Sequence, residues 1–106
     1  MRVYPFLEAM YRDHWFPNPV VDQGRTILVE LCQEIERQKP AGLKELYVLT
    51  EAAVERFNDL EEVFEANDSE IETVGREIIG DNFWDIAMGY GFEDADSEEL
   101  ISGRNW

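Results

Sequence analysis

The chain has 106 residues, which is close to the commonest size of a single folded domain and too short for two independent cores. Its 24 acidic and nine basic side chains give a formal net charge of −15, which disfavours direct contact with nucleic acid phosphates and with anionic membrane surfaces. Because 44% of the residues are hydrophobic, the chain can still bury a core, and we expect one domain that spans residues 1–106.

Two helices are predicted in the first 40 residues. Pro5 suits the first turn of a short helix that runs to about Asp13. Asn18 is a good N-cap and Pro19 is preorganised for the next position, so a second helix should begin there and stop before Pro40. The inward stripe of this second helix consists of Val20, Gly24, Ile27, Leu28, Leu31 and Ile35.

The segment from about Leu43 to Ala66 has the most regular apolar periodicity and predicts a long amphipathic helix. A break near Thr50 stays open, because threonine can cap a new helix, although the apolar stripe continues without a change of phase. Asn67 and Asp68 should end the helix. Its stripe consists of Leu43, Leu46, Tyr47, Thr50, Ala53, Val54, Phe57, Leu60 and Phe64.

Further helices are predicted after residue 68. Ser69 and Glu72 match a capping box and predict the start of a fourth helix, which Gly80 should end. Asp81 could cap a short fifth helix, and the run from Asp96 repeats the capping pattern before a last turn. The apolar residues of these segments are Ile71, Val74, Ile78, Ile79, Phe83, Ile86, Ala87, Tyr90, Leu100 and Ile101.

No segment shows the alternation of apolar and polar residues that is typical of a strand. We therefore predict an all-α fold, a small bundle or array of five to six helices joined by short loops, without a sheet. The order in which these helices pack stays open.

The chain contains one histidine and one cysteine. His14 has no fixed partner, although Asp13 is adjacent and Asp22 could approach it, so a structural or exposed role is favoured over a general base. Cys32 flanks the stripe of the second helix and is predicted to be a buried, inert thiol. A lone cysteine fits a reducing compartment, and the chain shows neither a signal-peptide pattern nor an apolar run of about 20 residues, so we expect a cytoplasmic protein.

The familiar metal and nucleotide motifs are incomplete. One histidine and one cysteine cannot form the usual structural zinc cluster. The run from Asp94 to Glu98 begins like a calcium loop but has Glu99 where glycine is needed, so a helix cap explains it better. Gly89 to Phe92 lacks the strand and third glycine of a dinucleotide site and reads as a helix exit. We therefore expect no metal and no cofactor, and we assign no catalytic residue.

Acidic side chains on the third predicted helix follow one another without basic partners. Glu51, Glu55 and Asp59 stack at successive i,i+4 positions, and Glu61 and Glu65 form another like-charged pair. Each such pair destabilises a helix by roughly 0.2–0.5 kcal/mol. The arrangement therefore needs an explanation other than helix stability.

Other helices of the chain use compensated spacings. Glu8 with Arg12, and Glu72 with Arg76, have the order and separation of favourable ion pairs. Two explanations of the uncompensated acids stay open: a solvated face that keeps the protein soluble, or a recognition surface for a basic protein. The contact residues of such a surface would be Glu51, Glu55, Asp59 and Glu62.

Aromatic residues gather at predicted loops and helix ends. We expect Trp15, Phe16, Phe83, Trp84 and Trp106 to plug the ends of a small helical core. The alternative is that such aromatic residues anchor a partner or line a pocket. The residues of a pocket in this second interpretation are Tyr11, His14, Trp15 and Phe16.

Four pieces of the chain carry a resemblance: residues 10–17 (MYRDHWFP), 21–25 (VDQGR), 57–60 (FNDL) and 67–74 (NDSEIETV). As a set they resemble a family of small acidic bacterial proteins classed as a domain of unknown function, over nearly the whole chain. The resemblance implies a bacterial source and brings no activity or catalytic residue. A looser likeness to toxin-immunity proteins is in size and charge only.

These observations favour an interaction protein over an enzyme. We expect an acidic, inhibitor-like or immunity-like protein that binds a basic partner, with its oligomeric state open. The alternative is a small-ligand-binding protein or an enzyme with a pocket around His14 and the neighbouring aromatic residues.

Overall fold

The structure, a computed structural model, describes residues 4–106, so residues 1–3 of the predicted domain lie outside the described residues. The described chain forms five helices and contains no strand. They are α1 (Glu8–Tyr11), α2 (Asn18–Gln38), α3 (Leu43–Ala66), α4 (Glu72–Gly89) and α5 (Ser97–Leu100). The all-α prediction is confirmed. None of these helices combines the length and the apolar character that a bilayer crossing requires.

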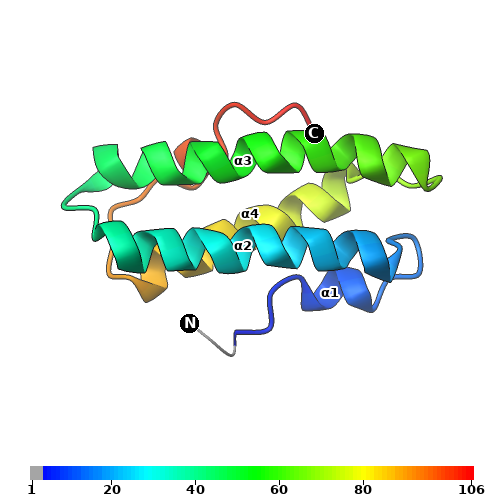
Figure 1. The fold of residues 1–106 in the computed structure, drawn as a ribbon, viewed down its shortest axis with the longest axis horizontal. Coiled ribbons are helices and arrows are strands. Elements are labelled where there is room, and N and C mark those ends of the chain that lie inside the picture. The colour runs from blue at the N-terminus through cyan, green and yellow to red at the C-terminus, as the bar shows by residue number, and fades with distance from the viewer. Residues whose placement is uncertain (1–3) are drawn as a thin grey trace.

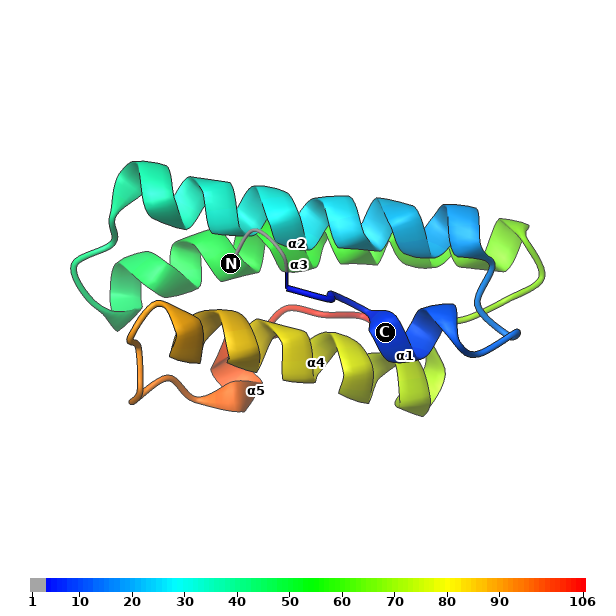
Figure 2. The same ribbon diagram turned by 90° about the horizontal axis from the view of Figure 1, so that it is seen from below.

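The helices form two layers (Figures 1 and 2). The long helices α2 and α3 run antiparallel, side by side, and α4 lies across one face of this pair with α1 and α5 in its layer. The C-terminal segment, residues 101–106, returns along α3 on the side away from α2 (Figure 1). The molecule measures 40 × 27 × 19 Å along its principal axes.

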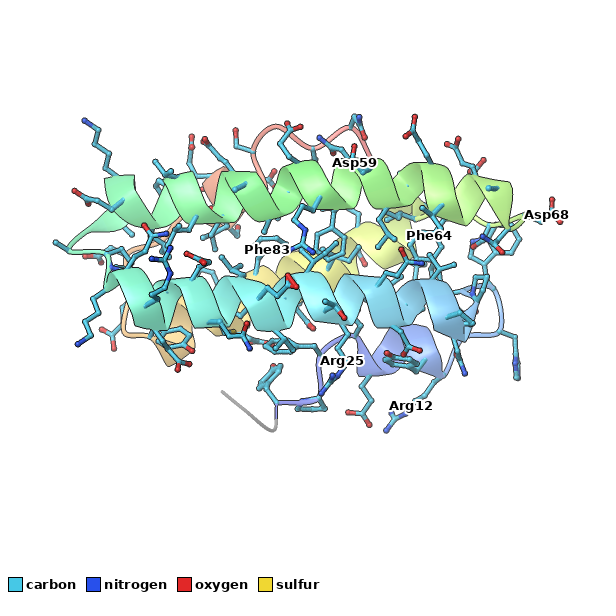
Figure 3. All side chains as sticks on the ribbon, viewed as in Figure 1. Arg12, Arg25, Asp59, Phe64, Asp68 and Phe83 are labelled. Atoms are coloured by element: carbon cyan, nitrogen blue, oxygen red, sulfur yellow. The ribbon has the colours of Figure 1, made fainter. Side chains whose placement is uncertain are left out.

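The core lies between the two layers. All six residues of the predicted α2 stripe are buried, as are the α3 residues from Leu46 to Phe64 that face them at helical spacing. Phe57 of α3 and Phe83 of α4 meet edge to face with ring centroids 5.9 Å apart, and Figure 3 shows Phe64 and Phe83 directed between the helices. Gly24 allows close packing, because a Cβ there would lie 2.9 Å from the Cδ1 of buried Leu7 and that side chain would have to move.

The segment that leads into α1 is held by a buried amide of α4. Leu7 adopts a left-handed φ of 60°, which is strained for a residue with a side chain. Its backbone N–H donates to Asn82 Oδ1 at 2.8 Å, and both residues are buried. The left-handed conformation of Leu7 interrupts helical geometry at this residue. Helix α1 therefore begins at Glu8 and is shorter than the helix expected from Pro5 to Asp13.

Several predicted boundaries are confirmed. The third predicted helix, Leu43 to Ala66, matches α3 without a break, and the Thr50 hydroxyl donates to the Tyr47 carbonyl within it. The Asp96 side chain caps α5 by accepting from two backbone N–H groups, and Gly91 has the positive φ of a helix exit. The predicted start of α2 was wrong by one residue, because the extended Pro17, rather than Asn18, is its N-cap.

The capping box predicted at the start of α4 is wrong. The N-cap of α4 is Ile71, no side chain caps this helix end, and the Ser69 hydroxyl donates to the Trp15 carbonyl at 2.7 Å. The Ile71 backbone N–H donates instead to Glu61 Oε2 of α3 at 3.0 Å, and α4 begins at Glu72. Long-range contacts have replaced the local cap.

The predicted break at Gly80 and Asp81 is also wrong, because α4 continues through both residues to Gly89. A single inward face crosses the expected boundary, since α4 residues on both sides of it are buried, so tertiary packing overrides the weak helix propensity of glycine. Val74, expected on this face, is 55% exposed. The buried α4 residues are Gly75, Ile79, Asn82, Phe83, Ile86 and Ala87.

Candidate functional site

A groove with an acidic lining follows the outer side of α3. Its volume is about 710 Å³, and the C-terminal segment forms its second wall. No basic side chain lines it. The lining, which we call the acidic groove, consists of Glu55, Asn58, Asp59, Glu61, Glu62, Glu65, Gly103 and Asn105.

Helical periodicity explains how α3 places these carboxylates together. Residues three or four positions apart share one face of a helix, so Glu55, Asp59 and Glu62 fall in one row beside the row of Glu61 and Glu65. Asp59 projects from the outer surface of α3 in Figure 3. Three of the four acids predicted for a partner surface therefore line the groove. Glu51 is exposed one turn earlier and does not line it.

The second wall is held in place by Asn58. Its side-chain Nδ2 donates to the Gly103 carbonyl at 3.2 Å, and its Oδ1 accepts from the Asn105 backbone N–H at 3.0 Å. Trp106 is buried against Phe57, with ring centroids 6.0 Å apart. The sequence analysis did not predict these contacts of Asn58. The only signal in the sequence is that Asn58 is an uncharged residue among the acidic residues on the polar face of α3.

The charges of the acidic groove are uncompensated. None of its five carboxylates forms an ion pair with any residue that the structure describes. Arg56, on the same helix, turns to Glu30 of α2 at 2.9 Å. Burial raises the pKa of Glu61; the hydrogen bond from the Ile71 N–H opposes this shift, and the negative charge of neighbouring glutamates, first Glu65, reinforces it. The groove therefore concentrates negative charge.

One of the two ion pairs predicted on other helices forms, and the other does not. Glu8 and Arg12 form theirs, as the spacing indicates. Glu72 and Arg76 do not form theirs, and the Arg76 Nε–H donates to the Trp106 backbone oxygen at 3.0 Å. This arginine thus holds the C-terminal segment from the side of α4.

The four residues of the alternative pocket differ in burial and contact different parts of the chain. The Tyr11 hydroxyl donates to Asp22, no hydrogen bond or ion pair joins Asp22 to His14, and His14 is exposed. Trp15 is also exposed, and its indole N–H donates to the Glu70 carbonyl at 3.0 Å. Phe16, by contrast, is a core residue. None of these four residues lines the acidic groove.

Metal ligation is not supported by the described geometry. Among residues 4–106, no group of three or more histidine, cysteine, aspartate or glutamate side chains could hold a metal ion. No three carboxylates of the acidic groove are therefore placed so that they could coordinate one metal ion together.

Cys32 is buried, as predicted, with 5% of its surface exposed. Burial raises the pKa of its thiol, which lowers the fraction of reactive thiolate near neutral pH. We expect a thiol reagent such as Ellman's reagent to label Cys32 slowly in the folded protein and fast after unfolding in urea. We also expect Cys32→Ala to keep every binding activity. Labelling of the folded chain at the rate of a free thiol would contradict this prediction.

Comparison with known proteins yields one match. A family model described as Family of unknown function (DUF5713) matches residues 1–106, and the chain therefore belongs to this family. The resemblance to a domain of unknown function is confirmed. No curated protein and no solved structure matches the chain.

Proposed function

We propose that this member of the family works through protein–protein contact, with the acidic groove of α3 as the surface that receives a basic partner. The observation that supports the proposal most directly is the set of five carboxylates in one groove without an ion pair to any described residue. Lysine and arginine side chains of a partner would supply the missing counter-charges.

The stability of the free protein does not account for this arrangement. Like-charged neighbours at i,i+4 destabilise a helix by roughly 0.2–0.5 kcal/mol for each pair. The chain forms compensated pairs elsewhere, such as Glu34 with Arg37 and Glu30 with Arg56. A concentrated negative field is useful for association, because it steers a cationic protein toward the groove and raises the rate of encounter.

Inhibition is one form that this contact can take. A small acidic domain that covers a basic surface blocks the access of that surface to anionic substrates such as nucleic acids, which is the action of an inhibitor-like or immunity-like protein. The Asn58 clamp on Gly103 and Asn105 supports such a role, because it holds the second wall of the groove before binding. The alternative pocket around His14 gains no comparable support from the geometry.

The Glu55→Gln variant tests the proposal. This substitution removes repulsion from both Glu51 and Asp59, so we expect the free energy of unfolding to rise by a few tenths of a kcal/mol. If the groove meets a basic partner, the same substitution should slow association and flatten its dependence on salt. The measurements are urea unfolding and the association rate, by surface plasmon resonance, with a basic partner captured at low salt and eluted at high salt.

Glu93→Gln is the matched control, because Glu93 is an exposed acid outside the acidic groove and its loss changes the net charge equally. Slower association of Glu55→Gln than of Glu93→Gln supports a local contact. Equal association rates for both variants and the wild type at low salt would leave solubility as the explanation of the acidic face.

A further inference from the structure

A second groove lies between α4 and the segment from Ser97 to Arg104, on the other side of the C-terminal segment from the acidic groove. Its volume is about 400 Å³, within the range of small-molecule sites. Figure 2 shows α5 packed against α4 beside this segment. Ile101 and Arg104 line this groove, whereas Gly103 and Asn105 line the acidic one. We call it the α4–α5 groove.

Gly80 lies in this groove without a packing reason to be glycine. A Cβ at Gly24 or Gly75 would approach a buried neighbouring side chain to 2.9 Å, so a larger residue at either position would have to displace that neighbour. A Cβ at Gly80 would meet only Ile101 Cδ1, at an ordinary 3.5 Å. Glycine in the middle of a helix is destabilising relative to alanine, and at Gly80 the missing side chain leaves open space in the wall of the groove.

Two of the nine basic residues of the chain line the α4–α5 groove. Arg76 uses its Nε–H on the Trp106 backbone oxygen, and no hydrogen bond or ion pair joins its terminal amino groups to a described residue. Arg104 makes a long contact of 3.4 Å with Glu98, and its own side chain is only 27% exposed. Guanidinium groups in such a setting are suited to a carboxylate.

The rest of the lining adds an aromatic surface and negative charge. Trp84 is 38% exposed although it is one of the largest apolar residues, and it stands beside the open position at Gly80. Glu77 and Asp81 also line the groove, and neither forms an ion pair with a residue that the structure describes. The groove thus presents cationic, anionic and aromatic groups together.

We propose that the α4–α5 groove binds a free α-amino acid with an aromatic side chain. The guanidinium groups of Arg76 and Arg104 receive its carboxylate, and the carboxylates of Glu77 and Asp81 receive its ammonium group. The aromatic side chain lies on Trp84 and occupies the space over Gly80. This ligand class is independent of the basic partner proposed for the acidic groove.

Ligands with only one kind of charge fit the lining less well. A phosphate carries up to two negative charges and would face the three carboxylates Glu77, Asp81 and Glu98. A lysine or arginine side chain of a peptide would face the two guanidinium groups. A zwitterion matches both sets at once, and a planar apolar group matches the indole.

Isothermal titration calorimetry with three compounds tests the ligand class: L-phenylalanine, 3-phenylpropionate, which lacks the ammonium group, and 2-phenylethylamine, which lacks the carboxylate. We expect L-phenylalanine to bind with a Kd of about 1 mM or tighter, and each analogue to bind at least about tenfold more weakly. Absence of binding up to about 10 mM L-phenylalanine would overturn the proposal. Equal binding of either 3-phenylpropionate or 2-phenylethylamine would overturn the assignment to an amino acid.

The Gly80→Ala variant locates the site without risk to the fold. We expect its Tm to rise by about 2–6 °C, because alanine favours the helix, and its affinity for L-phenylalanine to fall at least about tenfold, because the methyl group fills the floor of the groove. Val74→Ala, on the same helix but outside the groove, should leave the Kd within about twofold. Arg104→Gln should weaken L-phenylalanine binding at least about tenfold. Unchanged affinity in Gly80→Ala and Arg104→Gln would place any binding elsewhere and refute the site.

Discussion

Replacement of Phe57 by alanine is expected to lower the free energy of unfolding by about 3–5 kcal/mol. Phe57 is almost fully buried in the middle of α3, and its ring lies edge to face with Phe83 of α4 and beside Trp106 of the C-terminal segment. Gly24 of α2 leaves room for the same ring, because a Cβ there would lie 3.2 Å from Phe57 Cε1. One side chain thus joins three parts of the fold, and its removal leaves a cavity that rigid neighbours cannot fill.

Urea unfolding followed by far-UV circular dichroism measures this loss. A domain of this size has a total stability of about 5–15 kcal/mol, so the variant is expected to fold with a much lower midpoint. Val48→Ala is the matched control, because Val48 lies on the same helix and is 63% exposed, and its effect should stay within about 0.5 kcal/mol. A loss below about 1 kcal/mol for Phe57→Ala would mean that the α3 stripe is not the centre of the core.

Replacement of Trp106 by alanine is expected to lower the free energy of unfolding by about 2–4 kcal/mol. Removal of a buried tryptophan typically destabilises by about 3–5 kcal/mol. The indole Nε1–H of Trp106 is buried and has no hydrogen-bond partner among the described residues, and its loss offsets part of that figure. Trp106→Phe is the control, because it keeps an aromatic ring and removes the unpaired donor, and we expect a change of about 1 kcal/mol or less.

The same variant tests how the C-terminal segment serves both grooves. Trp106 holds this segment on α3, and the segment contributes Asn105 to the acidic groove and Arg104 to the α4–α5 groove. Trp106→Ala should therefore weaken binding at both grooves, whereas Trp106→Phe should preserve it. Phe57 and Trp106 are in contact, so the loss in the double alanine variant should be smaller than the sum of the single losses. An additive double variant would contradict the packing of the segment against α3.

Binding at the acidic groove and binding at the α4–α5 groove should differ in their dependence on salt. Binding at the acidic groove should fall steeply with salt, because it depends on long-range attraction between opposite net charges. Binding of a zwitterion at the α4–α5 groove should depend little on salt, because the ligand carries no net charge and its contacts are short. The two proposals can therefore fail independently.

Local spacing in the sequence determined the features of this protein that depend on i,i+3 and i,i+4 neighbours. The limits of α3, the inward stripes of α2 and α3 and the cap at Asp96 could all be predicted, because helix formation and capping act within a few residues. The row of uncompensated acids on α3 was visible for the same reason. These predictions needed no knowledge of how the helices pack.

Only the tertiary structure decided where distant groups meet. Ser69 bonds to Trp15 instead of capping α4, Arg76 turns to Trp106 instead of Glu72, and α4 continues through Gly80. In each case a contact or a buried face supplied by another part of the chain outweighs a local preference of about 1 kcal/mol or less. The second wall of the acidic groove has the same origin, because Asn58 and Asn105 are 47 positions apart and no local periodicity relates them.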